Sequence, residues 1–154
     1  MASDRLTVAL PTSTFLPSIG GVEIGLHNIA LGLCSRGHRP VVIAPASHVY
    51  KLRKLTTPLP YSLVAFPPKT LSLSRLSPDL ATILLSNYFK LLQWKFKFDI
   101  WHGTVGYPVG VALTRFGSNE VPHIIRCAGD DIQIDQKINY GMRLDPKVDG
   151  LGKK

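Results

Sequence analysis

The chain has 154 residues, the length of one domain, and its net charge at pH 7 is +8. Hydrophobic residues make up 45% of it and charged residues 18%, a balance that excludes a disordered or low-complexity chain. Cys34 and Cys127 are too few for a disulfide framework or a four-ligand zinc site, so a reducing compartment, the cytoplasm, is expected. No secretory signal is expected at the start, and no apolar stretch reaches the roughly 18 residues of a membrane-spanning helix.

The positive charge suggests an anionic partner. Basic side chains gather at residues 51–54 and, among aromatic residues, at 88–98. No arginine-rich arm or zinc finger accompanies them, so nucleic acid is not an expected partner. A phosphorylated ligand and an anionic membrane surface both stay open, and so does the simpler explanation that these lysines form a solvated face.

The first part of the chain predicts a strand, a helix and a second strand. Residues 5–10 form a short apolar run that Pro11 ends, and a polar loop follows over 12–21. From residue 22 apolar side chains recur at helical spacing until Gly37, a typical stop. Residues 41–44 are continuously apolar, as in a parallel strand covered on both faces. Together these elements predict a βαβ unit.

The rest of the chain continues the alternation. Ser77 as a capping hydroxyl, followed by proline and Asp79, predicts the start of a helix that runs to about residue 95. The other predicted elements are a strand at 61–66, a loop at 69–77, a strand at 98–102, a helix at 108–116 that Gly117 ends, and a strand at 121–127. Five strands alternating with helices predict an α/β fold with a single Rossmann-like, doubly wound, mostly parallel sheet.

Such sheets bind ligands just beyond the carboxyl ends of their strands. Gly20 and Gly21 follow the first predicted strand and open a helix, where backbone amides and the helix dipole favour a phosphate. The alternative is that the two glycines simply make a turn. The glycines do not fit the dinucleotide fingerprint or the P-loop, because neither the second-strand carboxylate nor a Gly-Lys-Ser/Thr sequence is present.

Three segments together resemble the N-terminal, acceptor-side half of family 4 glycosyltransferases of the GT-B fold. The most specific is PSIGGVEIGLHNIALGLCSRGHRP at 17–40, which is similar to the family's loop-helix-Arg-Gly-His signature. FDIWHG at 98–103 and VPHIIRCAGDDI at 121–132 resemble two of its later strand ends. The resemblance implies sugar transfer from a UDP- or GDP-sugar to an acceptor hydroxyl, with retention at the anomeric carbon and with neither a metal nor another cofactor.

The resemblance also implies roles for particular residues. Gly20 and Gly21 would lie over the cleft with their amides facing the donor diphosphate or the acceptor, and residues 36–38 would be structural. His102 would line the cleft near the reacting sugar as the catalytic candidate; the alternative is a strand-end histidine that ties down a loop.

The turn after the last predicted strand departs from the family pattern. Many members carry a histidine where this chain has Ala128. Gly129, Asp130 and Asp131 would contact substrate, although two aspartates before a short helix also suit a capping role.

The family's second half binds the donor nucleotide through a Glu-x7-Glu motif. This sequence has two glutamates, Glu23 and Glu120, and they do not have that spacing. The expected organisation is therefore an N-terminal glycosyltransferase domain at 1–149 and a tail at 150–154, with the donor-binding half absent and little or no activity of the chain alone. The alternatives are one subunit of a split transferase, which would need a partner subunit, or a non-catalytic module that binds an anionic membrane through residues 88–98.

Overall fold

The computed structural model describes residues 5–55, 58–67, 72–73, 76–117, 121–129, 134–138, 141, 144 and 146. Within them one five-stranded sheet has the order β3-β2-β1-β4-β5, and every neighbouring pair of strands is parallel. The strands are β1 (Thr7–Pro11), β2 (Arg39–Ala44), β3 (Ser62–Ala65), β4 (Ile100–Thr104) and β5 (His123–Arg126). The predicted α/β class and the single, doubly wound, Rossmann-like sheet are confirmed.

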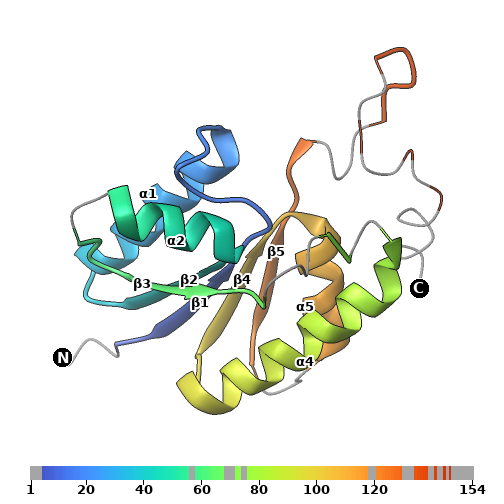
Figure 1. The fold of residues 1–154 in the computed structure, drawn as a ribbon. Helices are drawn as coiled ribbons and strands as arrows, with labels where there is room; N and C mark the ends of the chain where they lie inside the picture. Colours follow the sequence, from blue (N-terminus) through green and yellow to red (C-terminus); the bar gives the residue numbers. More distant parts are fainter. Residues whose placement is uncertain are drawn as a thin grey trace.

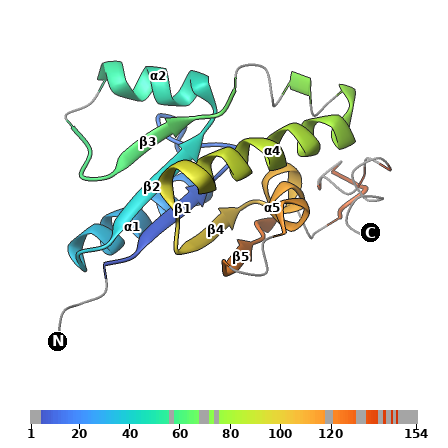
Figure 2. The same ribbon diagram turned by 90° about the horizontal axis from the view of Figure 1, so that it is seen from below.

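Helices cover both faces of this sheet (Figure 1). On one face lie α1 (Gly21–Ser35) and α2 (Ala46–Leu55), and on the other lie α4 (Pro78–Phe96) and α5 (Val111–Phe116), which follows a short turn, η1 (Gly106–Gly110). Figure 2 shows α4 and α5 packed beside each other on their shared face. From β1 the sheet extends to one edge through β2 and β3, and to the other edge through β4 and β5. Because the crossovers are right-handed in both directions, the helices lie in two layers, one on each face of the sheet.

The segment that ends α1 has structural contacts, as the resemblance implies. Gly37 has a φ of 85°, which favours glycine, and the Arg36 side chain donates a hydrogen bond to the Gly32 carbonyl at 2.9 Å. The Leu6 N–H donates to His38 Nδ1 at 3.4 Å. These contacts fix the turn that leads from α1 into β2.

Two local predictions need correction. The helix α2 is not predicted from the sequence, because Pro45 before it is as typical of the end of a strand as of the entry of a helix. Ser77 is the residue before α4, but its hydroxyl makes no capping bond, and its carbonyl accepts from the Ala81 N–H at 3.1 Å instead. The proline at the first position of α4 is sufficient to start the helix there.

The inner face of α4 agrees only in part with its sequence pattern. Leu84, Leu91 and Leu92 suit burial against a sheet, but of these three Leu92 alone is buried, while Leu84 and Leu91 are 48% and 55% exposed. The buried face instead contains Ala81, Leu85, Phe89 and Leu92. Both faces of α4 carry apolar residues at helical spacing, so the pattern alone does not tell which one meets the sheet.

We expect Gly103→Ala to destabilise the fold. A Cβ at this position of β4 would lie 2.5 Å from Leu113 Cδ1 and 3.3 Å from Val109 Cγ1, and both side chains are fully buried. Overpacking of this kind costs about 1–3 kcal/mol. Urea unfolding measures the loss in the free energy of unfolding. Gly21→Ala is the matched control, because a Cβ at Gly21 meets nothing within 4 Å. Equal stability of the two variants would contradict this packing.

Candidate functional site

The loops that follow β1, β4 and β5 meet at the carboxyl edge of the sheet, which we call the rim. Thr12, just after β1, forms an isolated parallel bridge with Thr104 at the end of β4. Thr104 is in turn in register with Arg126, the last residue of β5. Three strand ends therefore converge on the rim in the described residues.

The N-terminus of α1 lies on this rim and holds a carboxylate of its own. Glu23, in the first turn, is 9% exposed, and its Oε1 accepts a hydrogen bond from the Thr14 hydroxyl at 2.6 Å. A Cβ at Gly20 would lie 2.6 Å from Glu23 Oε2, so a larger residue there would displace the carboxylate from its present position. Gly21 has open space around its Cα. Gly20 therefore lies against a carboxylate, whereas Gly21 is exposed.

The imidazole of His102 lies on the α1 side of β4. Side chains alternate along a strand, so His102 shares a face with Ile100, which packs against the core under α1 and α2. Burial lowers the pKa of His102 below the ordinary value of 6.5, and the charge of Arg126 lowers it further. His102 is therefore neutral at pH 7 and has one ring nitrogen that accepts and one that donates.

Arg126 supplies a cation between His102 and α1, and the sequence analysis did not single it out. Its guanidinium lies against the helix, where a Cβ at Gly25 would be 3.4 Å from Arg126 Nη1. The signal available in the sequence is its place as a charged residue ending an otherwise apolar strand. A guanidinium beside the open N-terminus of a helix is suited to an anionic group.

A second group of polar side chains lies on the α2 side of the same helix. Ser18 Oγ and His48 Nε2 are 3.3 Å apart. Burial lowers the pKa of His48, the charge of Lys51 lowers it further, and the Glu23 carboxylate opposes both effects. His48 was missed because α2 itself was not predicted.

The end of β4 has two further unusual features. The Thr104 hydroxyl is buried and has no hydrogen-bond partner within the described part of the chain. The next residue, Val105, has a φ of 81°, a strained conformation for a β-branched residue. Unpaired buried polar groups and backbone strain are both enriched at functional sites.

The remaining predicted site residues follow β5. Gly129 is exposed, three residues beyond the end of that strand. Asp130 and Asp131 lie outside the described residues, and their predicted contacts stay predictions. Among the described residues, no group of three or more His, Cys, Asp or Glu side chains could hold a metal, and no helix is long and apolar enough to cross a bilayer.

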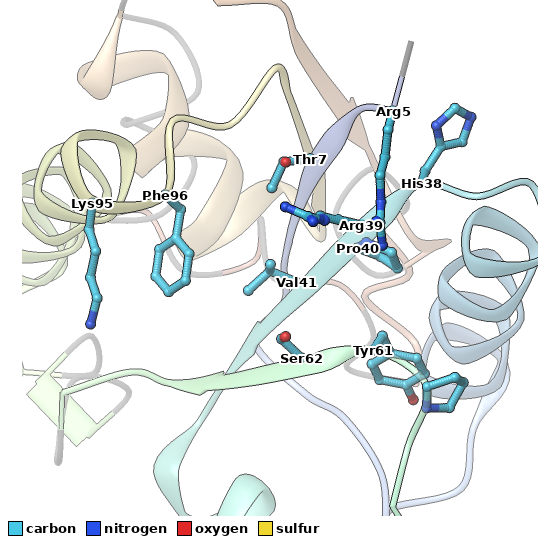
Figure 3. Close-up of a pocket in the computed structure, with 11 residues that line it drawn as sticks. Arg5, Thr7, His38, Arg39, Pro40, Val41, Tyr61, Ser62, Lys95 and Phe96 are labelled. Carbon is cyan, nitrogen blue, oxygen red and sulfur yellow. The ribbon is translucent and has the colours of Figure 1, made fainter. Parts of the chain in front are cut away.

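A separate pocket of about 410 Å³ lies at the opposite, amino edge of the sheet (Figure 3). We call it the amino-edge pocket. Its lining residues are Arg5, Thr7, His38, Arg39, Pro40, Val41, Pro60, Tyr61, Ser62, Lys95 and Phe96. The sequence analysis does not predict it, because its residues come from separate strands and from the end of α4.

Comparison with known proteins supports the fold assignment. No family model matches the chain, and no curated protein matches its sequence. Two solved structures do resemble it: a glycosyltransferase from Rickettsia africae ESF-5, with a TM-score of 0.58 and 16% identity over 88% of this chain, and the glycotransferase of kitacinnamycin, with a TM-score of 0.52 and 19% identity over 80% of it.

The similarity to these two structures concerns the fold, and this chain spans 33% and 30% of their lengths. The described structure is thus similar to part of two glycosyltransferases.

The titration of His102 tests the electrostatics of the rim. We expect Arg126→Gln to raise the pKa of His102 while leaving it below 6.5, because burial is the larger of the two causes. The matched control is Lys51→Gln, which should raise the pKa of His48 and leave His102 unchanged. NMR titration of the imidazole ring protons measures both. An unchanged His102 in Arg126→Gln would mean that the guanidinium does not face the ring.

Proposed function

We propose that this chain is the acceptor-side half of a retaining, nucleotide-sugar-dependent glycosyltransferase of family 4. The observation that carries the proposal is the rim, where Arg126 and the neutral His102 lie beside the open N-terminus of α1. The fold similarity to two glycosyltransferases supports it, since each is matched over about a third of its length. The resemblance of residues 17–40 to the family signature supports it independently of the fold.

The groups on the rim are suited to a sugar and an anion. His102 can accept a hydrogen bond from a sugar hydroxyl or donate one to it, which is the role proposed for the catalytic candidate. The guanidinium of Arg126 and the backbone N–H groups at the N-terminus of α1, which begins at Gly21, offer positive potential to a phosphate. Glu23 offers the opposite charge beside Gly20, so we propose that the anion lies on the Arg126 side of α1, with the sugar hydroxyls within reach of His102.

The donor is proposed to be a UDP- or GDP-sugar that acts as co-substrate, without a metal. Residues 1–149 form the acceptor-side domain in this proposal and 150–154 a tail. A second half, which carries the donor nucleotide, completes the cleft as part of a longer chain or as a separate subunit. The proposed location is the cytoplasm, since two cysteines in the sequence suit a reducing compartment.

The experiment that tests the proposal begins with the DNA that follows the Lys154 codon, translated in all three frames. We expect a second α/β half with a Glu-x7-Glu spacing, and we expect the purified extended protein to transfer sugar from a UDP- or GDP-donor. If no frame encodes such a half, a separate donor-side protein should co-purify with the chain and restore transfer. Failure of both the extended protein and the co-purified complex to transfer sugar would overturn the proposal.

A further inference from the structure

The outer face of α4 carries an apolar stripe that no described element covers. Its side chains recur at helical spacing, and their exposed fractions are 46% for Leu80, 45% for Ile83, 48% for Leu84, 55% for Leu91 and 79% for Trp94. The stripe is about 21 Å long at a rise of 1.5 Å per residue. Asn87 is exposed on the same line and interrupts the row between Leu84 and Leu91. Single exposed apolar residues are common, but several gathered on one face of a helix mark an interaction surface.

Lysines border this apolar stripe on both sides. At 100° per residue, Lys90 projects from one flank of the stripe and Lys95 from the other, and both are exposed. No acidic residue occurs between positions 80 and 98. Asp79, at the start of the helix, is paired with Arg115 of α5. The outer face of α4 is therefore predominantly apolar, with the polar Asn87 in its middle, and cationic at its borders.

The amino-edge pocket extends the same charge beyond the end of the helix. Figure 3 shows Lys95 and Phe96 on the α4 side of this pocket, with Arg39 and Arg5 on the side of the first two strands. No acidic residue lines it. Asp99, the next acid along the chain after Asp79, accepts a hydrogen bond from the Thr7 N–H at 2.7 Å.

We propose that the outer face of α4 docks on an anionic membrane surface, with the apolar stripe at the level of the acyl-chain boundary and the lysines among the lipid phosphates. An interfacial helix has this arrangement of an apolar face, flanking lysines and an aromatic anchor, and Trp94 supplies the anchor. A chain of net charge +8 gains further attraction from such a surface. This surface does not depend on the proposed function.

Two other occupants fit the charge less well. A second copy of the chain would bring two lysine-bordered stripes together, and like charges in contact disfavour such a dimer. A donor-side half would face the rim, whereas Lys95 and Phe96 at the end of α4 line the amino-edge pocket at the opposite edge of the sheet. Lipid phosphates match the lysines on both flanks at once.

The test is co-sedimentation of the 154-residue chain with vesicles of phosphatidylcholine alone or with about one third phosphatidylglycerol. We expect binding to the anionic vesicles, which falls as salt is raised toward about 1 M because the Debye length shrinks to about 3 Å. We also expect brominated acyl chains to quench Trp94, since the other tryptophan, Trp101, is fully buried.

Matched variants locate the surface. Lys90→Gln with Lys95→Gln should weaken binding to anionic vesicles about 30-fold, at the usual contribution of each lysine near a charged membrane. The control is Lys51→Gln with Lys54→Gln, which removes the same charge from α2 on the opposite face of the sheet and should weaken binding much less. Trp94→Ser should lower binding about tenfold or more, and circular dichroism checks that each variant is folded.

Three results would overturn the proposal. These are an absence of binding to anionic vesicles, equal binding to neutral and anionic vesicles, and equal losses in the α4 and α2 lysine variants. If the chain does not bind vesicles but forms a concentration-dependent dimer, and Trp94→Ser abolishes that dimer, the stripe is the contact surface for a second copy instead.

Discussion

Trp101→Ala should lower the free energy of unfolding by about 3–5 kcal/mol, the usual cost of removing a large buried aromatic side chain. Trp101, on β4, is fully buried, with ring centroids of Phe89, Phe98 and Phe116 at 5.1, 5.0 and 5.3 Å. Its indole N–H also donates to Gln93 Oε1 at 2.7 Å. The variant removes the residue through which α4, α5 and β4 pack together.

Urea unfolding followed by circular dichroism measures this loss. Trp101→Phe is the matched variant, because it keeps an aromatic ring but leaves the Gln93 amide oxygen without the indole donor, and we expect a smaller loss of about 1–3 kcal/mol. A loss below about 1.5 kcal/mol for Trp101→Ala would mean that the aromatic cluster on this side of the sheet is not well packed.

The second large effect concerns catalysis by the isolated chain. We expect the 154-residue protein to transfer sugar at least about 10³-fold more slowly than a completed two-domain enzyme. Transfer requires preorganised groups on both sides of a water-poor cleft, and removal of even one stabilising group from such a site costs about 10²–10³-fold. In the described structure the rim is one wall, formed from loops at a single edge of the sheet.

The rate of sugar transfer is measured by mass spectrometry, with labelled UDP- and GDP-sugars as donors and a panel of acceptors. The extended protein is the positive control in the same assay. Turnover by the 154-residue chain within the usual enzymatic range of about 1–10³ s⁻¹ would contradict the account of the rim as half of a site.

Much of the fold could be predicted because the apolar pattern agrees with the positions of the glycines and prolines that end the elements. The continuous apolar run of β2, the glycine after α1 and the helix that Gly117 ends are all found where they were expected. The pattern fails at α2, which is short, basic and opened by a proline that also suits the end of a strand. It fails again at α4, because both faces of that helix are apolar and only the sheet decides which one is buried.

The candidate site could be predicted less completely than the fold. The order of strands places His102 and the glycine pair on one edge, and parallel topology alone predicts this. The sequence does not show that Glu23 folds back beside Gly20 or that Arg126 crosses from β5 to α1, because these contacts depend on side-chain directions at the rim. The resemblance names glycines, whereas the structure adds the charged groups that surround them.

The most direct measurement is a map of backbone amide shifts of the isotope-labelled chain during titration with UDP-glucose, GDP-mannose and simple hexoses up to about 10 mM, the range of weak binding. The account predicts shifts at the rim, at Gly21, Gly25, His102 and Arg126, and none at Arg39 or Ser62 in the amino-edge pocket. Shifts confined to the amino-edge pocket, or no shift with any of these ligands, would contradict the assignment of the rim as a sugar-binding surface.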